Sequence, residues 1–466
     1  MFNNKIISKL NTIINTKFFY DVYLIILSLI TILGYLFNPI LGMGLLIILS
    51  VIMLIITNDM KYIIPNMLFI IFNINNGFKV DEIPIFLIIC VIIIIITLLL
   101  FIIKNKVNKY KMKSIVGFIG LAIIELIPIF WNKTINGDNK ALYFLYFGNL
   151  GYLLIYFFFS NGIRSESIKY LAKSFSFLLI ILCVECTIKV IELKDTVDNV
   201  FKLGYFVGFG VCNEAVIMIL VALPFSFYLI TKEKNVVLII FEIFKIILGI
   251  IGVILTFSRG GYIFLPIEIG LLTILLIIFN YKRSGFKYFF LGIVTALMLF
   301  IIIKADDIPS FNDNVINVVF SNGLSDSGRF KLYSDAFNIF NSNGLNMILG
   351  SGIVSEVRGL ATAYGFQENA VVIYHSTLFE TLVIGGLVGF IFLLIIIKDK
   401  YVSLYKSNNK ELFWFLLVGY ILADIYGMAD NTYHMYYYMI AISIIMACID
   451  SDNYYNNKEI DYMKLF

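Results

Sequence analysis

The sequence predicts an all-α, polytopic integral membrane protein with about 12–14 transmembrane helices. Of its 466 residues, 60% are hydrophobic and only 14% are charged, which excludes an ordinary soluble domain. Apolar runs of about 17–25 residues, long enough to cross a ~30 Å hydrocarbon core, recur along the chain. Lysine and arginine gather in alternate loops, as in membrane proteins whose basic loops face the cytoplasm.

The apolar runs divide the chain into three regions. Residues 1–304 are expected to form a transmembrane helix bundle of about eleven spans, residues 305–375 an extracytoplasmic loop, and residues 376–466 the last transmembrane helices with a short cytosolic tail. The individual spans are expected near 19–37, 39–57, 62–76, 83–103, 114–131, 141–160, 174–192, 208–230, 236–256, 261–280, 286–303, 376–397, 411–427 and 433–449.

The basic loops fix the expected orientation. One set of alternate loops carries the run from Lys104 to Lys113 and, near the C-terminus, Lys398 and Lys400. The positive-inside rule makes this set cytoplasmic, with both termini on the same side and the loop at 305–375 outside. The net charge of +4 comes from these loops and favours anionic lipid headgroups, not nucleic acid, as partners.

The long polar loop contains a helical pattern that begins at Arg329. Four aromatic residues follow at spacings of three and four, namely Phe330, Tyr333, Phe337 and Phe340. This pattern predicts an amphipathic helix on the outer membrane face, which Gly344 is expected to close. The first turn of a helix disfavours a cation, so the position of Arg329 indicates an anionic partner.

Arg259 occupies a tight outer turn between two expected spans, in the sequence Phe257-Ser258-Arg259-Gly260-Gly261. Its guanidinium offers two parallel donors to a phosphate, and the glycines let an anion approach the backbone. Snorkelling of the side chain to lipid headgroups is the alternative interpretation. Arg358, further along the polar loop, is a third candidate for binding an anion.

His375 stands immediately before an expected membrane helix. The dipole at a helix N-terminus favours the neutral imidazole, so His375 can accept a proton near neutral pH and is a candidate general base. A structural role is the alternative for a lone histidine. His434, beside Asp430 and Asn431 on the last outer turn, is a second contender.

Carboxylates near the membrane are further candidates. Glu214 and Glu380 lie near the outer ends of expected spans, where they can face a polar cavity. The chain's D-x-D motif, Asp450-Ser451-Asp452, falls in the expected cytosolic tail and is poorly placed to chelate a metal at the outer face. Arginine is therefore left as the outer-face group that neutralises phosphate.

Four segments, in this order, resemble the O-antigen ligase and polysaccharide polymerase (Wzy-type) membrane glycosyltransferase family. They are Gly208–Ala215, which includes Asn213 and Glu214, then Thr256–Gly260, then Ser327–Gly352, and finally the stretch from His375 to Gly385 that includes Glu380. Two features depart from the family pattern. Cys212 replaces a proline, and Lys202 stands upstream where members often carry an arginine.

The resemblance implies a GT-C-like fold and a metal-independent glycosyltransferase with no cofactor. The donor would be an undecaprenyl-diphosphate-linked glycan at the outer face of the bacterial cytoplasmic membrane. Arg259 and Arg329 would hold the diphosphate and His375 would deprotonate the acceptor hydroxyl. Further candidates for binding substrate are Arg358, Asn213, Glu214 and Glu380. A glycan acceptor, membrane lipids and a chain-length regulator protein complete the expected partners.

Several functions are compatible with these features. The first choice is a polymerase that joins lipid-linked oligosaccharide repeats into an O-antigen or capsule polysaccharide. A ligase that moves polymer onto lipid A-core and a protein O-oligosaccharyltransferase share the donor chemistry and differ in the acceptor. A transporter or lipid-glycan flippase fits the helix count equally well, but it typically carries inverted repeats and charges at the midplane. The exofacial position of the candidate residues favours an enzyme.

Overall fold

A computed structural model describes residues 16–73, 85–105, 111–130, 139–164, 166–193, 206–207, 210–280, 329–352 and 374–463, and the single positions 12, 14 and 108. Most of these residues are helical. The strand pairing among them is a two-residue antiparallel ladder between β1 (Phe206–Val207) and β2 (Gly210–Val211). Eight of the described helices are long and apolar enough to cross a membrane. The predicted all-α, polytopic class is confirmed, and the chain is a multi-pass membrane protein.

Shorter apolar helices overlap four further expected spans. They run over Met60–Asn73, Ile92–Phe101, Ile115–Glu125 and Leu150–Gly162. The first of them is divided into η1 (Met60–Ile63), α4 (Ile64–Phe69) and η2 (Ile70–Asn73). The span expected at 286–303 and the loop residues 305–328 and 353–373 lie outside the described residues.

The chain forms two compact units, and each contains segments from both sides of the expected loop. The first unit combines Met1–Leu171, Gly328–Asn408 and Gly427–Phe466, and the second combines Ala172–Ser327 with Asn409–Tyr426. The first unit further contains α2 (Lys17–Phe37), α3 (Pro39–Thr57), α5 (Ile85–Asn105), α6 (Ile115–Leu126), η5 (Ile127–Phe130), α7 (Asn139–Gly162), α15 (Arg329–Phe340), α16 (Gly344–Leu349), α17 (Thr377–Tyr405), η12 (Thr432–His434) and α19 (Tyr436–Met463). The second unit holds most of α8 (Ile168–Leu193) and α18 (Lys410–Met428), together with α10 (Cys212–Lys232), α11 (Val236–Leu255) and α12 (Arg259–Asn280).

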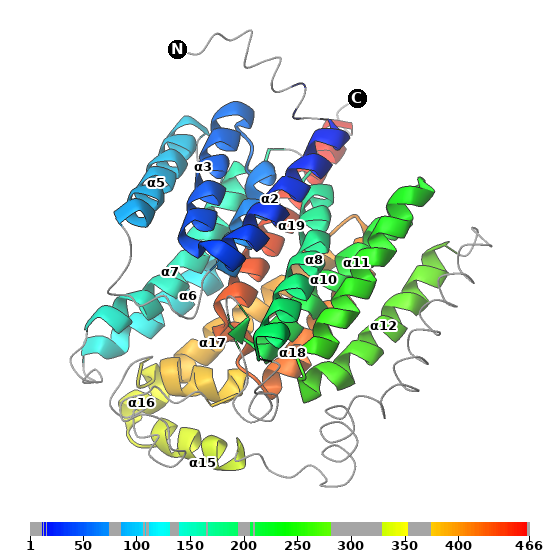
Figure 1. Ribbon diagram of the computed structural model, residues 1–466. Helices are drawn as coiled ribbons and strands as arrows, with labels where there is room; N and C mark the ends of the chain where they lie inside the picture. Colours follow the sequence, from blue (N-terminus) through cyan, green and yellow to red (C-terminus); the bar gives the residue numbers. More distant parts are fainter. Residues whose placement is uncertain are drawn as a thin grey trace, which may run out of the picture. The chain divides into compact units, whose positions relative to one another are not determined.

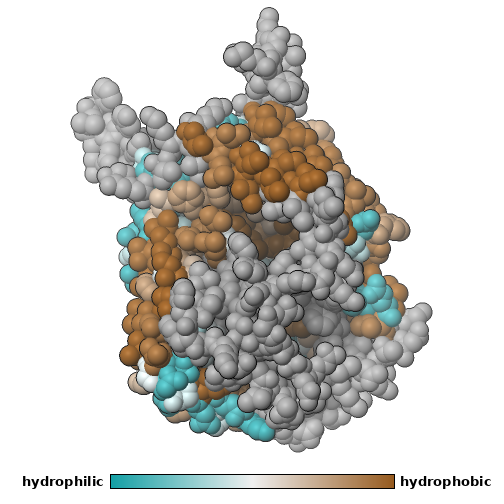
Figure 2. All heavy atoms as spheres, turned by 90° about the vertical axis from the view of Figure 1, so that its left-hand side faces the viewer, coloured by the Kyte–Doolittle hydropathy of each residue, from teal (hydrophilic) through white to brown (hydrophobic). Residues whose placement is uncertain are grey.

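The surface of α5 shows that these helices require lipid. Leu100 and Ile103 leave 62% and 76% of their surface exposed, and most other large side chains on the outward side of α5 are also apolar. Figure 2 faces the side of the molecule on which α5 lies and shows broad hydrophobic surface there. In water such a surface drives aggregation, whereas the hydrocarbon of a membrane accommodates it.

A sharp break divides α17 into two helices. At Gly386 the backbone has φ 61° and ψ −158°, which is not helical. Gly350 packs against this break with φ 80°, and a Cβ atom on it would lie 2.1 Å from the carbonyl oxygen of Ile384. The G-x-G segment at Gly350 therefore meets the double glycine of α17, and both need glycine for this approach. Broken membrane helices occur where backbone is buried in protein or lines a polar cavity.

Two short helices from the polar loop pack on α17 near this break (Figure 1). Ala336 of α15 is buried in a small cluster between α15 and α17, and Phe340 is also buried. Phe330 and Phe337 point away and are 71% and 53% exposed, so α15 is amphipathic. Gly344 opens α16 and does not close α15, because the Asn343 side chain caps the first turn of a new helix.

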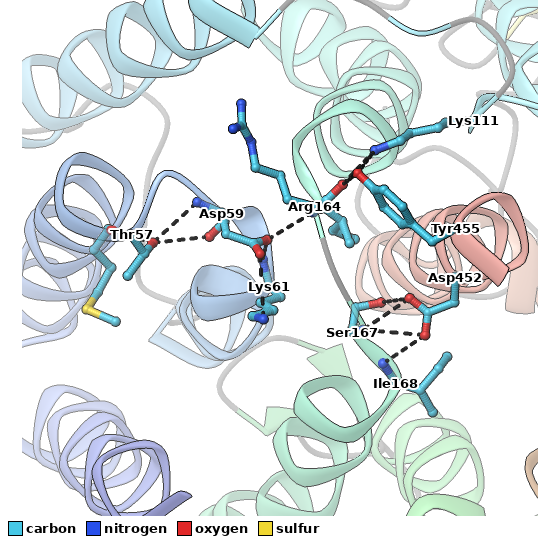
Figure 3. A network of polar contacts seen from close by, with 11 residues as sticks. Thr57, Asp59, Lys61, Lys111, Arg164, Ser167, Ile168, Asp452 and Tyr455 are labelled. Carbon is cyan, nitrogen blue, oxygen red and sulfur yellow. Dashed lines mark hydrogen bonds and ion pairs between the residues drawn. The ribbon is translucent and has the colours of Figure 1, made fainter. Parts of the chain in front are cut away.

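The end of α19 ties distant segments of the first unit together (Figure 3). The Asp452 carboxylate accepts hydrogen bonds from the backbone N–H groups of Ser167 (3.1 Å) and Ile168 (3.3 Å) and so caps the start of α8. Asp450 accepts a hydrogen bond of 2.7 Å from the hydroxyl of Tyr156 on α7. Both carboxylates of the D-x-D motif therefore hold helices together. Burial raises the pKa of Asp452 to about 6.

Candidate functional site

The candidate site residues form two groups, one in each compact unit. His375, Arg329 and Glu380 lie in the first unit, whereas Asn213, Glu214 and Arg259 lie in the second. Arg358 is outside the described residues. Each group is built around the start of a helix, α17 in the first unit and α12 in the second.

His375 is held in an unusual backbone conformation just before α17. Its φ of 48° is left-handed, a region that residues other than glycine seldom adopt and that often marks a functional constraint. Its side chain is 42% exposed, and its Nδ1 lies 3.5 Å from Oδ1 of the buried Asp430. Nδ1 itself is buried, so the open part of the ring is the part that carries Nε2.

The carboxylate beside His375 belongs to the turn that precedes α19. Nδ1 of His375 and Oδ2 of Asp430 are both buried and have no hydrogen-bond partner within the described part of the chain. A distance of 3.5 Å is longer than a hydrogen bond, but catalytic hydrogen bonds often tighten only when substrate is bound. A carboxylate in this position orients the imidazole and stabilises it once it has taken a proton.

Glu380 is buried and holds the backbone around His375. Its carboxylate accepts hydrogen bonds from the backbone N–H of Tyr374 (3.0 Å) and from the side-chain amide of Asn431 (3.4 Å). The same Asn431 side chain accepts a bond of 2.7 Å from the backbone N–H of Ser376. The residues on either side of His375 are therefore both fixed by hydrogen bonds, and these bonds hold His375 in its left-handed conformation.

The turn and α17 share further hydrogen bonds. The backbone N–H of Thr377 donates to the carbonyl oxygen of Asp430 at 3.1 Å. The hydroxyl of Thr381, one turn later, lies 2.8 Å from Nε2 of His434. His434 thus has a hydrogen-bond partner on α17, whereas the part of the His375 ring that carries Nε2 is open.

Arg329 is brought close to this group by α15. The hydroxyl of Tyr333 donates to the carbonyl oxygen of His375 at 3.2 Å, and its ring stacks on Phe379 of α17. Arg329 precedes Tyr333 by four residues and so lies on the same face of α15, about 6 Å further along the helix. Within the described residues no carboxylate pairs with Arg329. Its guanidinium is therefore available to an anion.

Arg259 follows a strained turn in the second unit. Phe257 has a left-handed φ of 53°, and the hydroxyl of Ser258 accepts a bond of 3.3 Å from the backbone N–H of Gly261. Ser258 therefore caps α12, and Arg259 is the first helical residue. Its side chain is exposed, and within the described residues no carboxylate pairs with it.

The turn is fixed by residues from two other helices. The Ser258 hydroxyl donates to Oδ1 of Asn213 at 2.7 Å and lies 3.0 Å from the hydroxyl of Tyr426, which also bonds to Asn213. Gly260 lies directly against the ring of Tyr426. Asn213 thus supports the arginine turn from the start of α10. Glu214 accepts a bond of 2.8 Å from the backbone N–H of Val211 and caps the same helix.

The arrangement in the second unit suits an anion. The starts of α10 and α12 meet at the hydrogen bond between Asn213 and Ser258. Each helix start carries partial positive charge, which attracts phosphate and carboxylate groups. Arg259 adds a full positive charge at the same place.

Three contributors are not among the candidate site residues chosen from the sequence. Asp430 and Asn431 stand out there only as neighbours of His434, and Tyr426 belongs to an expected span. A short polar run between two membrane helices is the signal that marks the turn at Asp430. No such signal exists for Tyr426, whose role depends on a contact with α12.

Comparison with known families agrees with the motifs. Residues 244–394, about one third of the chain, match the family model described as O-antigen ligase. No curated protein matches the chain. The matched segment contains Arg259, Arg329, Arg358, His375 and Glu380. It agrees with the resemblance found in the motifs: residues 244–394 carry an O-antigen ligase domain, which supports a family of the O-antigen ligase/polymerase type.

Proposed function

We propose that this protein is a polymerase that joins undecaprenyl-diphosphate-linked oligosaccharide repeats into a surface polysaccharide. Its site lies at the outer face of the bacterial cytoplasmic membrane, with both termini in the cytoplasm. The observation that carries the proposal is the pairing of His375 with a buried carboxylate at the start of a broken membrane helix. Such a pair is suited to removing a proton from a hydroxyl, which glycosyl transfer requires and substrate transport does not.

The proposed reaction needs a base and charge neutralisation. The acceptor hydroxyl oxygen attacks the anomeric carbon of the donor sugar, and Nε2 of His375 takes its proton. The bond between the anomeric carbon and the diphosphate oxygen breaks, and undecaprenyl diphosphate leaves as an anion. Asp430 orients the imidazole and stabilises the imidazolium that forms. Diphosphate is a good leaving group, so the reaction has no need of a strong acid.

The remaining candidates have supporting roles in this proposal. Arg329 and Arg259 bind the diphosphate, whose charge they neutralise in the transition state. Asn213 holds the turn of Arg259, and Glu380 holds the backbone of His375. Glu214 and Arg358 remain proposed substrate-binding residues. No metal is part of the mechanism, because guanidinium groups supply the positive charge.

The decisive experiment replaces His375. Membranes that contain the full-length His375→Ala protein are expected to form polymer ~10²–10⁴-fold more slowly than wild type, with lipid-linked single repeats accumulating. His375→Gln keeps a hydrogen-bonding side chain but cannot take a proton at neutral pH, so it is expected to be equally slow. Normal polymerisation by the glutamine variant would overturn the role as base. Transfer of preformed polymer to lipid A-core, without growth of polymer, would identify a ligase.

The proposed orientation has its own test. Ser342 is exposed in the turn between α15 and α16, and Lys169 is exposed at the start of α8. A membrane-impermeant thiol reagent added to intact cells is expected to label Ser342→Cys but to label Lys169→Cys only after permeabilisation. Ser114 is buried, so a cysteine there is unsuitable as the inner control. The opposite labelling pattern would move the site to the cytoplasmic side and refute the proposed donor.

A further inference from the structure

Lys400 is a lysine that the sequence places among cytoplasmic loop residues but that the structure buries completely. It lies on the second half of α17 with an exposed fraction of 0%. An ammonium at this position is expensive, since burial within a membrane protein removes it from water. Lysines in the membrane-spanning part of a chain usually have a specific partner and a function.

The partner of Lys400 is the turn that carries Asp430. Its Nζ donates a hydrogen bond of 2.6 Å to the hydroxyl of Tyr433 and lies 5.2 Å from the centre of the same ring. A second, longer contact of 3.5 Å reaches the hydroxyl of Tyr438 on α19. Tyr433 is 3% exposed, so this bond is shielded from water and stronger than the same bond at a surface.

Tyr433 connects this buried charge to the proposed base. Its backbone N–H points to the hydroxyl of Thr377 at 3.4 Å, and that hydroxyl donates to the carbonyl oxygen of Asp430 at 3.2 Å. Asp430 in turn lies beside Nδ1 of His375. Lys400 thus holds the turn from the second half of α17, while Asn431 and Glu380 hold it from the side of His375.

We propose that Lys400, acting through Tyr433, is a positioning residue that sets the Asp430 carboxylate against His375. This inference rests on the proposed role of His375 as base. A lysine with a purely structural role would stabilise the packing of the helices to the same extent with or without the Asp430 carboxylate. A positioning lysine affects catalysis only as long as the carboxylate that it positions is present.

A double-mutant cycle in the full-length protein tests this difference. Tyr433→Phe is expected to lower the rate of polymer formation from lipid-linked repeats about five- to tenfold, with expression and apparent KM unchanged. In the Asp430→Asn background, the same change is expected to lower the rate less than twofold. Tyr438→Phe is the matched control, since it removes a hydroxyl from the same ammonium but keeps the ring that packs against Tyr433, and it is expected to keep the wild-type rate.

Lys400→Met removes the charge at similar volume, and its loss is expected to match that of Tyr433→Phe. Should this variant fail to reach the membrane, the conservative Tyr433→Phe cycle still decides. Equal losses from Tyr433→Phe in both backgrounds would overturn the positioning role. An active His375→Ala protein would instead overturn the proposed base, and the two failures are therefore distinguishable.

Discussion

The starts of α17 and α12 are built alike but expose different chemistry. In each, a residue with left-handed φ precedes a serine, and the helix begins directly after it: His375 before Ser376, and Phe257 before Ser258. In each, the serine is bonded to an asparagine from another segment, Asn431 for Ser376 and Asn213 for Ser258. A common local construction therefore fixes both turns.

The difference lies in which residue presents an exposed side chain. At α17 it is the strained residue itself, and a buried carboxylate stands behind its ring. At α12 the strained Phe257 only shapes the turn, and the exposed Arg259 follows it with no carboxylate paired to it among the described residues. A general base needs a partner that fixes its tautomer and stabilises its charged form. An anion-binding arginine is weakened by such a partner and strengthened by a helix N-terminus.

The difference between the two helix starts is tested most directly by removing the carboxylate beside His375. Asp430→Asn keeps the shape of the turn but loses the charge that stabilises the imidazolium, so polymerisation is expected to fall roughly 10- to 100-fold. The rate of polymer formation in membranes with equal protein content is the measurement. A wild-type rate in this variant would show that His375 works without a carboxylate partner and that the two turns differ less than the structure indicates.

A smaller loss is expected at the arginine turn. Arg259→Lys keeps the positive charge but loses the paired donors of the guanidinium, so the rate is expected to fall roughly tenfold. Arg329→Lys should behave in the same way. Arg164, whose guanidinium lies over the ring of Phe101, provides the matched control, because Arg164→Lys changes an arginine outside either turn. If all three lysine variants are fully active, Arg259 and Arg329 serve only as headgroup anchors.

The sequence was sufficient to predict most of the helices. The thickness of the hydrocarbon core sets the length of apolar runs, so helices such as α3 and α11 match their expected spans closely. The ion pair of Glu242 with Lys245, 2.7 Å apart on α11, also follows from spacing alone.

What sequence reasoning could not provide is set by long-range contacts. The apolar run at 376–397 predicts one continuous span, yet the helix breaks at Gly386, where Gly350 packs closely against it. Likewise, residue type makes His375 a candidate base, but only the folded structure reveals that Asp430 lies beside its ring. From the sequence, Lys400 is expected in a cytoplasmic loop, and only the structure shows that it is bonded to Tyr433.

The start of α8 provides a third case for this comparison, and the effect expected there is the smallest. Ser167 precedes α8 as Ser376 precedes α17, but its partner is the carboxylate of Asp452 instead of an asparagine (Figure 3). Burial raises the pKa of Asp452 from 3.8 to about 6, although the hydrogen bonds from Ser167 and Ile168 oppose this shift. Between these two pH values the folded protein binds more protons at Asp452 than the unfolded chain does.

The contribution of Asp452 to stability therefore falls as pH rises from about 4 to about 6, and above pH 6 the loss is complete. The difference between the two pKa values corresponds to at most about 3 kcal/mol. Asp452→Asn gives α8 the same kind of partner as α12 and α17 and cannot ionise. Its midpoint of thermal unfolding in detergent should exceed that of wild type at pH 7, and the two midpoints should converge toward pH 4. Parallel curves across this range would show that Asp452 ionises as freely in the folded protein as in the unfolded chain, and would contradict the raised pKa.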